Sequence, residues 1–147
     1  MEELDRRILS LLSHDGRMSF TDLGRATGLS TSAVHQRVRR LEGRGVIRGY
    51  RAILDPEAVA LPLTAFVAVK TIDTADVDKA PELIATIPAV EACYSVAGDE
   101  AYLLKVRCSS PQTLETLLAQ IRAAAGVTTS TTVVLSTSYE DRPLLPE

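Results

Sequence analysis

The chain has 147 residues, of which 46% are hydrophobic and 24% charged, a balance typical of a soluble globular protein with one ordinary domain or two small ones. The sequence contains no uninterrupted apolar stretch of about 18 residues, which excludes a membrane-spanning helix, and its charged start is unlike a secretion signal. We therefore expect a cytoplasmic protein. An evenly spread net charge of −3 would argue against nucleic-acid binding.

The charges, however, are divided unevenly along the chain. Residues 1–54 contain ten arginines and six acidic residues, a net charge of +4, whereas residues 55–147 carry a net charge of −7. This asymmetry favours an anion-binding module joined to a module with another task. We predict two domains, 1–54 and 55–147.

The start of the sequence predicts two short helices. Residues 4–14 are expected to form an amphipathic helix with a stop at Gly16. Its apolar positions are Leu4, Ile8, Leu11 and Leu12. A second helix follows, with a capping pattern at Ser19 and Asp22 and an end at Gly28. Its predicted inner face is formed by Leu23 and Ala26.

A third helix is predicted almost at once, with Ser30 or Thr31 as its cap. Its apolar side consists of Val34, Val38 and Leu41, and its pattern breaks at Gly43 and Gly45. Two helices joined by a tight turn at Gly28 match the helix-turn-helix, in which the second helix enters the major groove of DNA.

The opposite side of this third helix is rich in hydrogen-bond donors. Glutamine and arginine pair with purine edges, serine and histidine reach bases or phosphates, and flanking arginines neutralise phosphates. The alternative is an ordinary solvated face, but such a face mixes charges of both signs and this one contains no acid. The predicted DNA contacts are Thr31, Ser32, His35, Gln36, Arg37, Arg39 and Arg40, together with Arg48 from the following segment.

The segment after the third helix, residues 46–54, alternates enough to predict a short strand or ribbon. Arg48 and Arg51 would be available there to the DNA backbone, and the segment would also link the two domains.

The remaining sequence predicts the order β-α-β-β-α-β. The strands are expected at 63–72, 90–96, 101–108 and 128–138, and the helices between Val77 and Ile87 and between Ser110 and Gly126. This order is typical of a ferredoxin-like α+β domain, with a four-stranded sheet and both helices on one side. Because the strands are apolar on both faces, we expect the uncovered face to pack against a second copy; the alternative is a monomer with a partly polar outer face.

The sequence gives little support to an enzyme. It has no nucleophile motif, phosphate loop or metal-ligand cluster, so neither catalysis, a cofactor nor a metal is predicted. Cys93 and Cys108 lie in apolar runs without CxxC or Cys/His spacing, which favours buried, reduced thiols over a disulfide or a metal site.

Several motifs resemble one known family over nearly the whole chain. LDRRILSLLSHDGRMSFTDL at 4–23, GLSTSAVHQRVRRLEGRGVI at 28–47, EACYSVAG at 91–98 and YLLKV at 102–106 are similar to the Lrp/AsnC, or feast/famine, transcription regulators. The resemblance implies a winged helix-turn-helix that binds double-stranded promoter DNA as a dimer, and dimers that assemble into tetramers or octamers through a sensing domain.

The resemblance also implies an amino acid or related effector bound between dimers, near the hairpin that contains Gly98, Asp99, Glu100 and Ala101. Many family members carry an aspartate at the position of Ala101, where a carboxylate suits an ammonium group. In this chain, Asp99 and Glu100 offer carboxylates from neighbouring positions. An architectural DNA-wrapping protein with weak sequence preference is the alternative to a specific regulator.

Overall fold

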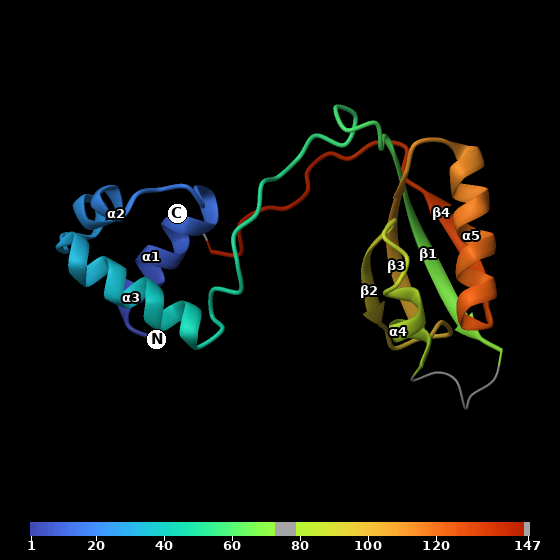
Figure 1. Ribbon diagram of the computed structural model, residues 1–147, viewed down its shortest axis with the longest axis horizontal. Coiled ribbons are helices and arrows are strands. Elements are labelled where there is room, and N and C mark those ends of the chain that lie inside the picture. The colour runs from blue at the N-terminus through green and yellow to red at the C-terminus, as the bar shows by residue number, and fades with distance from the viewer. Residues whose placement is uncertain (73–78, 146–147) are drawn as a thin grey trace. The chain divides into compact units, whose positions relative to one another are not determined.

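Figure 1 shows the computed structural model of the chain, which describes residues 1–72 and 79–145. They form two compact units, one comprising Met1–Ile53 together with the described residues from Ser138 onward, the other comprising Leu54–Thr137. This division differs from the predicted domains 1–54 and 55–147 in one respect, because the last part of the chain groups with the N-terminal unit. There the guanidinium of Arg51 donates to the carboxylate of Asp141 at 3.1 Å.

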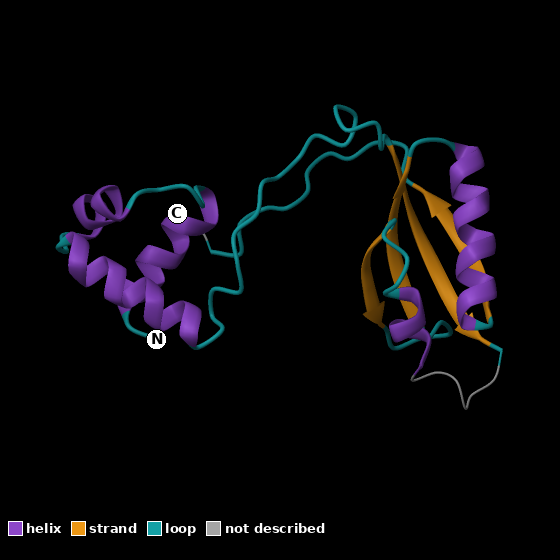
Figure 2. Ribbon diagram, in the orientation of Figure 1, coloured by secondary structure: helices purple, strands orange, loops and turns teal. Residues whose placement is uncertain are grey.

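The N-terminal unit contains the three predicted helices, α1 (Glu3–His14), α2 (Phe20–Thr27) and α3 (Thr31–Gly43). Each helix contributes to a small apolar core, because the residues at helical spacing face one another. The core residues are Ile8, Leu23, Val34 and Val38, all at most 1% exposed. Figure 2 shows these helices in purple, joined by short loops.

The inner face of α2 differs from the prediction at one position. Ala26 is exposed, and Gly24 is buried instead. The reason is a close approach of the chain after the turn, since a Cβ atom on Gly24 would lie 2.6 Å from the carbonyl oxygen of Leu29. Glycine is the residue that admits such an approach of backbone to backbone.

The predicted strand at residues 46–54 is wrong, because this segment forms a bend followed by a loop. A strand needs a neighbouring strand for its backbone hydrogen bonds, and within this described segment no strand pairing is present. Its contacts are made by side chains instead, and the Tyr50 hydroxyl donates to a carboxylate oxygen of Glu42 at 3.0 Å. The N-terminal unit thus has helix-turn-helix geometry without wing strands in the part of the chain described.

The C-terminal unit is a four-stranded antiparallel sheet with helices on one face, which confirms the α+β prediction (Figure 2). The strands are β1 (Leu63–Thr71), β2 (Val90–Ser95), β3 (Tyr102–Cys108) and β4 (Val127–Val133), in the order β2-β3-β1-β4. The helices α4 (Ala80–Ile84) and α5 (Pro111–Ala125) pack on alternate residues of β1 and β3. Val67 and Leu104, opposite each other in the register, lie at the centre of this core.

Most predicted strand bounds differ from the observed ones by a single residue, and two elements differ by more. The last strand ends at Val133 rather than at 138, because β1, its partner, begins at Leu63 and leaves later residues no strand to pair with. Leu135 is accordingly 98% exposed. The helix predicted from Val77 is observed as the shorter α4, and Val77 itself lies outside the described residues.

The cysteines are free, but only one is buried, so the prediction for Cys93 is wrong. Cys108 faces the helices, whereas Cys93 is exposed on β2, which lies at the edge of the sheet. Among the described residues, no group of three His, Cys, Asp or Glu side chains is arranged to hold a metal ion. None of the described helices has the length and apolar character of a membrane span.

We expect Gly24→Ala to destabilise the N-terminal unit by about 1–3 kcal/mol, the usual cost of forcing an added methyl group into packed structure. Urea unfolding, followed through the NMR signal of the Ile8 methyl groups, measures this loss. Gly43→Ala is the matched control, because a Cβ there meets nothing within 4 Å. Equal stability of the two variants would contradict the role assigned to the close approach at Gly24.

Candidate nucleic-acid interface

The turn between α2 and α3 is built by local hydrogen bonds. Gly28 adopts a left-handed conformation with φ of 73°, and the Leu29 N–H donates to the Gly24 carbonyl at 3.0 Å. Ser30 then caps α3, since its hydroxyl accepts from the Ala33 N–H at 3.2 Å. These contacts fix where α3 begins relative to α2.

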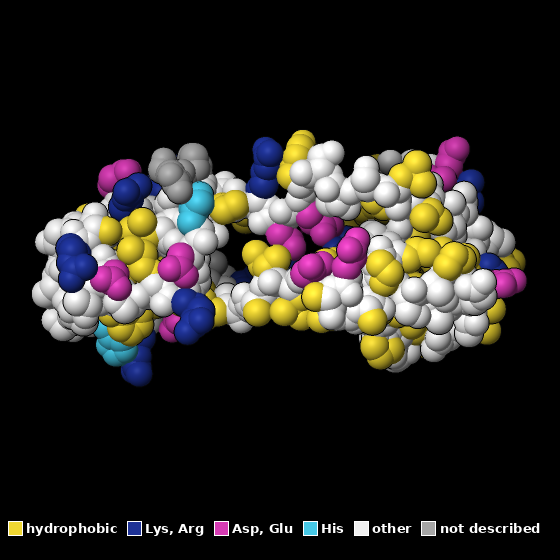
Figure 3. All heavy atoms as spheres, turned by 90° about the horizontal axis from the view of Figure 1, so that it is seen from above, with side chains coloured by type: hydrophobic (Ala, Val, Ile, Leu, Met, Phe, Trp, Pro, Cys, Tyr) yellow, Lys and Arg dark blue, Asp and Glu magenta, His cyan; other side chains and the backbone are white. Residues whose placement is uncertain are grey.

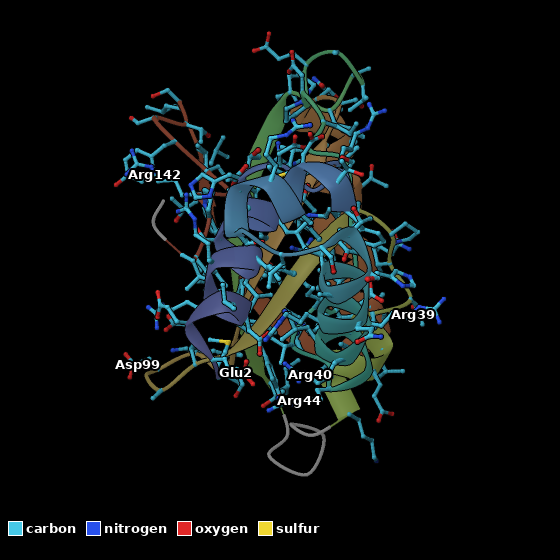
Figure 4. The ribbon with its side chains drawn as sticks, turned by 90° about the vertical axis from the view of Figure 1, so that its left-hand side faces the viewer. Glu2, Arg39, Arg40, Arg44, Asp99 and Arg142 are labelled. Carbon is cyan, nitrogen blue, oxygen red and sulfur yellow. The ribbon has the colours of Figure 1, made fainter. Side chains whose placement is uncertain are left out.

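One side of α3 packs inward and the other is open to solvent. Val34, Val38 and Leu41 are buried, as predicted. Thr31, Ser32, Gln36 and Arg39 are exposed. No carboxylate of the described residues lies within ion-pair distance of Arg39. In Figure 4, the Arg39 side chain points away from the body of the unit. This face presents the donors that pair with base edges.

His35 lies beside that face, and its ring already contacts another side chain of the unit. Its ring is half-buried, and its centroid lies 5.1 Å from that of Phe20 at an interplanar angle of 56°. A tilted pair at this separation is a favourable aromatic contact between α2 and α3. His35 therefore contributes to packing of the two helices, in addition to the DNA contact predicted for it.

Arg37 and Arg40 face α1 and are engaged with its acidic residues. Arg37 Nη1 lies 2.8 Å from Asp5 Oδ1 and 2.7 Å from Glu2 Oε2. Arg40 Nη2 lies 3.0 Å from the other oxygen, Asp5 Oδ2. Asp5 is only 2% exposed, so both arginines compensate a buried carboxylate. The structure thus separates these two arginines from the open face that holds Arg39.

The charges of this cluster stabilise one another. Burial alone raises the pKa of the Asp5 carboxyl, but the hydrogen bonds and positive charges of Arg37 and Arg40 outweigh it, so this pKa lies below its ordinary value. Hydrogen bonds to Glu2 and Asp5 likewise raise the pKa of Arg37. The Asp5 carboxylate and the Arg37 guanidinium therefore each favour the charged form of the other.

The segment after α3 places its two arginines differently. Arg48 is exposed, and no described carboxylate lies within ion-pair distance of it. Arg51 is exposed too, but is paired with Asp141 from the C-terminal segment. Arg48 is thus the residue of this segment whose charge is available to a phosphate.

The predicted effector residues lie on the connection between β2 and β3. The Ala101 N–H donates to the Val69 carbonyl at 2.9 Å, which ties the end of this loop to β1. Gly98 and Asp99 are exposed, Glu100 is half-buried, and Asp99 extends outward in Figure 4. The loop therefore offers two carboxylates beside a fixed backbone.

Sequence reasoning missed Asp5 and Glu2 as parts of the interface. The available signal was the position of Asp5 itself, three residues before the buried Ile8 and so on the same face of α1. An acid on a buried face requires a partner. Its partners, Arg37 and Arg40, lie 32 and 35 positions further along the chain, so the local pattern does not reveal them.

Comparisons with known proteins agree with this arrangement. The sequence model of the AsnC-type helix-turn-helix domain matches residues 1–42, and that of the Lrp/AsnC ligand binding domain matches residues 64–144. The HTH-type transcriptional regulator LrpA of Mycobacterium tuberculosis is 47% identical over 146 residues, which cover 99% of this chain and 97% of that protein.

Two solved structures extend the comparison. A feast or famine regulatory protein from M. tuberculosis, complexed with L-methionine, is 48% identical and has a TM-score of 0.96 over 99% of both chains. A transcriptional regulator from Neisseria meningitidis, solved as an L-methionine complex, is 25% identical. Its TM-score is 0.88, and the match covers 95% of this chain and 93% of that one.

The chain combines a helix-turn-helix, whose second helix has an open, donor-rich face, with a ferredoxin-like sheet. Together with its similarity to regulators, this defines a DNA-binding transcription regulator rather than an enzyme. Both domain models match in the expected order and together cover most of the sequence. The chain belongs to the Lrp/AsnC family of regulators.

We expect Asp5→Asn to make the acid stability of the N-terminal unit less dependent on pH. Because the pKa of Asp5 is depressed in the folded state, its contribution is complete well above the unfolded value of about 3.9 and is lost as pH falls below it. The stability difference between wild type and variant should thus be present at neutral pH and narrow below about pH 4. Urea midpoints across this range measure it.

Glu3→Gln is the control for this titration, because Glu3 is an exposed acid in the same first turn of α1. It should leave the acid limb of the stability profile as in wild type. A wild-type advantage over Asp5→Asn that persists unchanged into strong acid would exclude Asp5 as the titrating group.

Proposed function

We propose that α3 is the recognition helix of this regulator and that it reads base edges in the major groove through Ser32, Gln36 and Arg39, with Thr31 at its N-terminus. The observation that carries this assignment concerns Arg39, which is exposed on the face opposite the buried Val34 and Val38 and has no ion-pair partner among the described residues. Gln36 and Arg39 are three residues apart and so share one surface of the helix. Bidentate contacts from such side chains discriminate between bases.

The remaining predicted contacts take other parts in this proposal. Arg48 neutralises a backbone phosphate, and His35 holds α3 against Phe20 at the border of the interface. Residues 1–54 act as the DNA-binding domain, and residues 55 to about 137 as the sensing and oligomerisation domain.

We propose further that the effector is an amino acid with an apolar side chain and that it binds near Gly98, Asp99, Glu100 and Ala101. Two related structures are L-methionine complexes, which supports this class of ligand. Asp99 and Glu100 would pair with the ammonium group, while Ala101 leaves room where an aspartate is common in the family.

The proposed assembly is a dimer of this cytoplasmic protein, formed through the uncovered sheet face and built up to a tetramer or octamer. On that face, Phe66, Ala68 and Leu103 are half-buried, and Tyr94 is 53% exposed. Figure 3 shows hydrophobic side chains grouped on the surface of the C-terminal unit. A second copy would remove this apolar surface from water.

Arg39→Ala should weaken binding to the preferred DNA by about 1–3 kcal/mol and should lower the preference over random DNA, because a base contact is lost. Fluorescence anisotropy with both DNAs at fixed salt measures the two effects. Arg122→Ala, a charge change on the exposed side of α5, is the control. If Arg39→Ala binds both DNAs as wild type does, α3 does not read bases through Arg39.

L-methionine should raise the thermal stability of the protein, with a gain of about 2.7 kcal/mol when it is present at a hundred times its dissociation constant. A thermal-shift screen against the common amino acids tests this, and Glu100→Gln should reduce the shift. Stabilisation by none of the amino acids would exclude this effector class and favour a regulator that acts without one.

A further inference from the structure

The acidic start of α1 and two arginines of α3 form an ion cluster, consisting of Glu2, Asp5, Arg37 and Arg40. Asp5 is its buried member, whereas the side chains of Arg40 and Glu2 are 46% and 60% exposed. Asp5 accepts from Arg37 through Oδ1 at 2.8 Å, and from Arg40 through Oδ2 at 3.0 Å and Oδ1 at 3.2 Å. Glu2 accepts from Arg37 at 2.7 Å. Two carboxylates thus neutralise two guanidinium groups, and both oxygens of the buried acid are used.

The arginines of α3 point in different directions, and the cluster includes only those that face α1. Arg37 and Arg40 are three residues apart, so they lie on one side of the helix, which is the side that faces α1. Arg39 is turned about 100° from Arg40 and about 200° from Arg37. Figure 4 shows Arg40 and Glu2 close together and Arg39 extending to the other side. Of these three arginines, Arg39 is the one without a carboxylate partner among the residues that the structure describes.

We propose that Asp5, with Glu2, is a positioning and specificity-determining pair for the DNA reader, which withdraws Arg37 and Arg40 from phosphate and leaves base reading to the Arg39 face. This inference rests on the recognition helix assigned above. Asp5 acts without touching DNA, because it is 2% exposed and lies beneath the two arginines.

Withdrawing these arginines matters because attraction between arginine and phosphate does not depend on the DNA sequence. Each arginine on a phosphate strengthens binding to any sequence and adds about 0.9 to the slope of log affinity against log salt. Two free arginines beside the reading face would therefore raise affinity for random DNA as well as for the operator, and would add no discrimination between bases. Held by Asp5, they instead lock the rotation of α3 against α1, which fixes where Gln36 and Arg39 point.

The test is Asp5→Asn in the full chain, with binding to preferred and random DNA measured by anisotropy at several salt concentrations. We expect a salt slope on random DNA that is steeper by about 1–2, and affinity for random DNA about three- to tenfold higher, because the released arginines reach phosphates. The preference for the operator should fall. A merely structural role for Asp5 would lower affinity without steepening the slope.

Glu3→Gln is the matched control, since it removes one negative charge from the same turn of α1 at an exposed site. Its slope should equal that of wild type. The variant Asp5→Asn/Arg37→Gln/Arg40→Gln should return the slope to the wild-type value, because the released charges are gone.

Arg40→Gln keeps the inference testable even where Asp5→Asn fails to fold. We expect it to leave the salt slope unchanged, since Arg40 is withdrawn from DNA in the wild type. A slope lower by about 1 would show that Arg40 contacts a phosphate and would overturn the proposal. An unchanged slope in a folded Asp5→Asn would also overturn it. The assignment of α3 as the recognition helix is tested separately. It is wrong if Arg39→Ala binds the preferred and the random DNA with wild-type affinity.

Discussion

Helix α3, the proposed recognition helix, is held in place by a very small apolar core, and the rest of the N-terminal unit depends on this constraint. Ile8, Leu23, Val34 and Val38 are the fully enclosed residues of that core. Units of this size bury a smaller share of their surface than larger domains do, so apolar packing alone leaves α3 weakly constrained. Polar contacts around the core supply the remaining definition.

These polar contacts act at different points of α3. The turn before it is set by backbone approach at Gly24 and by the cap at Ser30, which together fix where the helix starts. The ion cluster around Asp5 joins α1 to α3 and so fixes which side of α3 faces α1. The position and the rotation of α3 are thus determined by separate groups. The proposed base reading requires both, because hydrogen bonds to base edges tolerate little displacement.

Much of this architecture follows from local patterns in the sequence. Helical spacing located α1 to α3 and α5, and Gly28 located the turn. Apolar runs located the first three strands of the sheet, and alternation located the last. The misses share a physical cause, because they depend on contacts distant in sequence: the partner of Asp5, the absence of a strand beside residues 46–54, the end of β4 where β1 begins, and the edge position of Cys93. The open face of α3 was visible locally, but which of its arginines are neutralised was not.

The pairing of β1 with β4 has a consequence for how such a protein arises. Ala65, near the start of β1, pairs with Val133 at the end of β4, and the Val134 N–H donates to the Thr64 carbonyl. The two ends of the C-terminal unit are therefore neighbours, and the chain resumes the N-terminal unit from Ser138. Adjacent ends are the condition under which one domain is inserted within another. A C-terminal unit exchanged by recombination would have to meet the same condition, and the exchange would need two junctions in the gene rather than one.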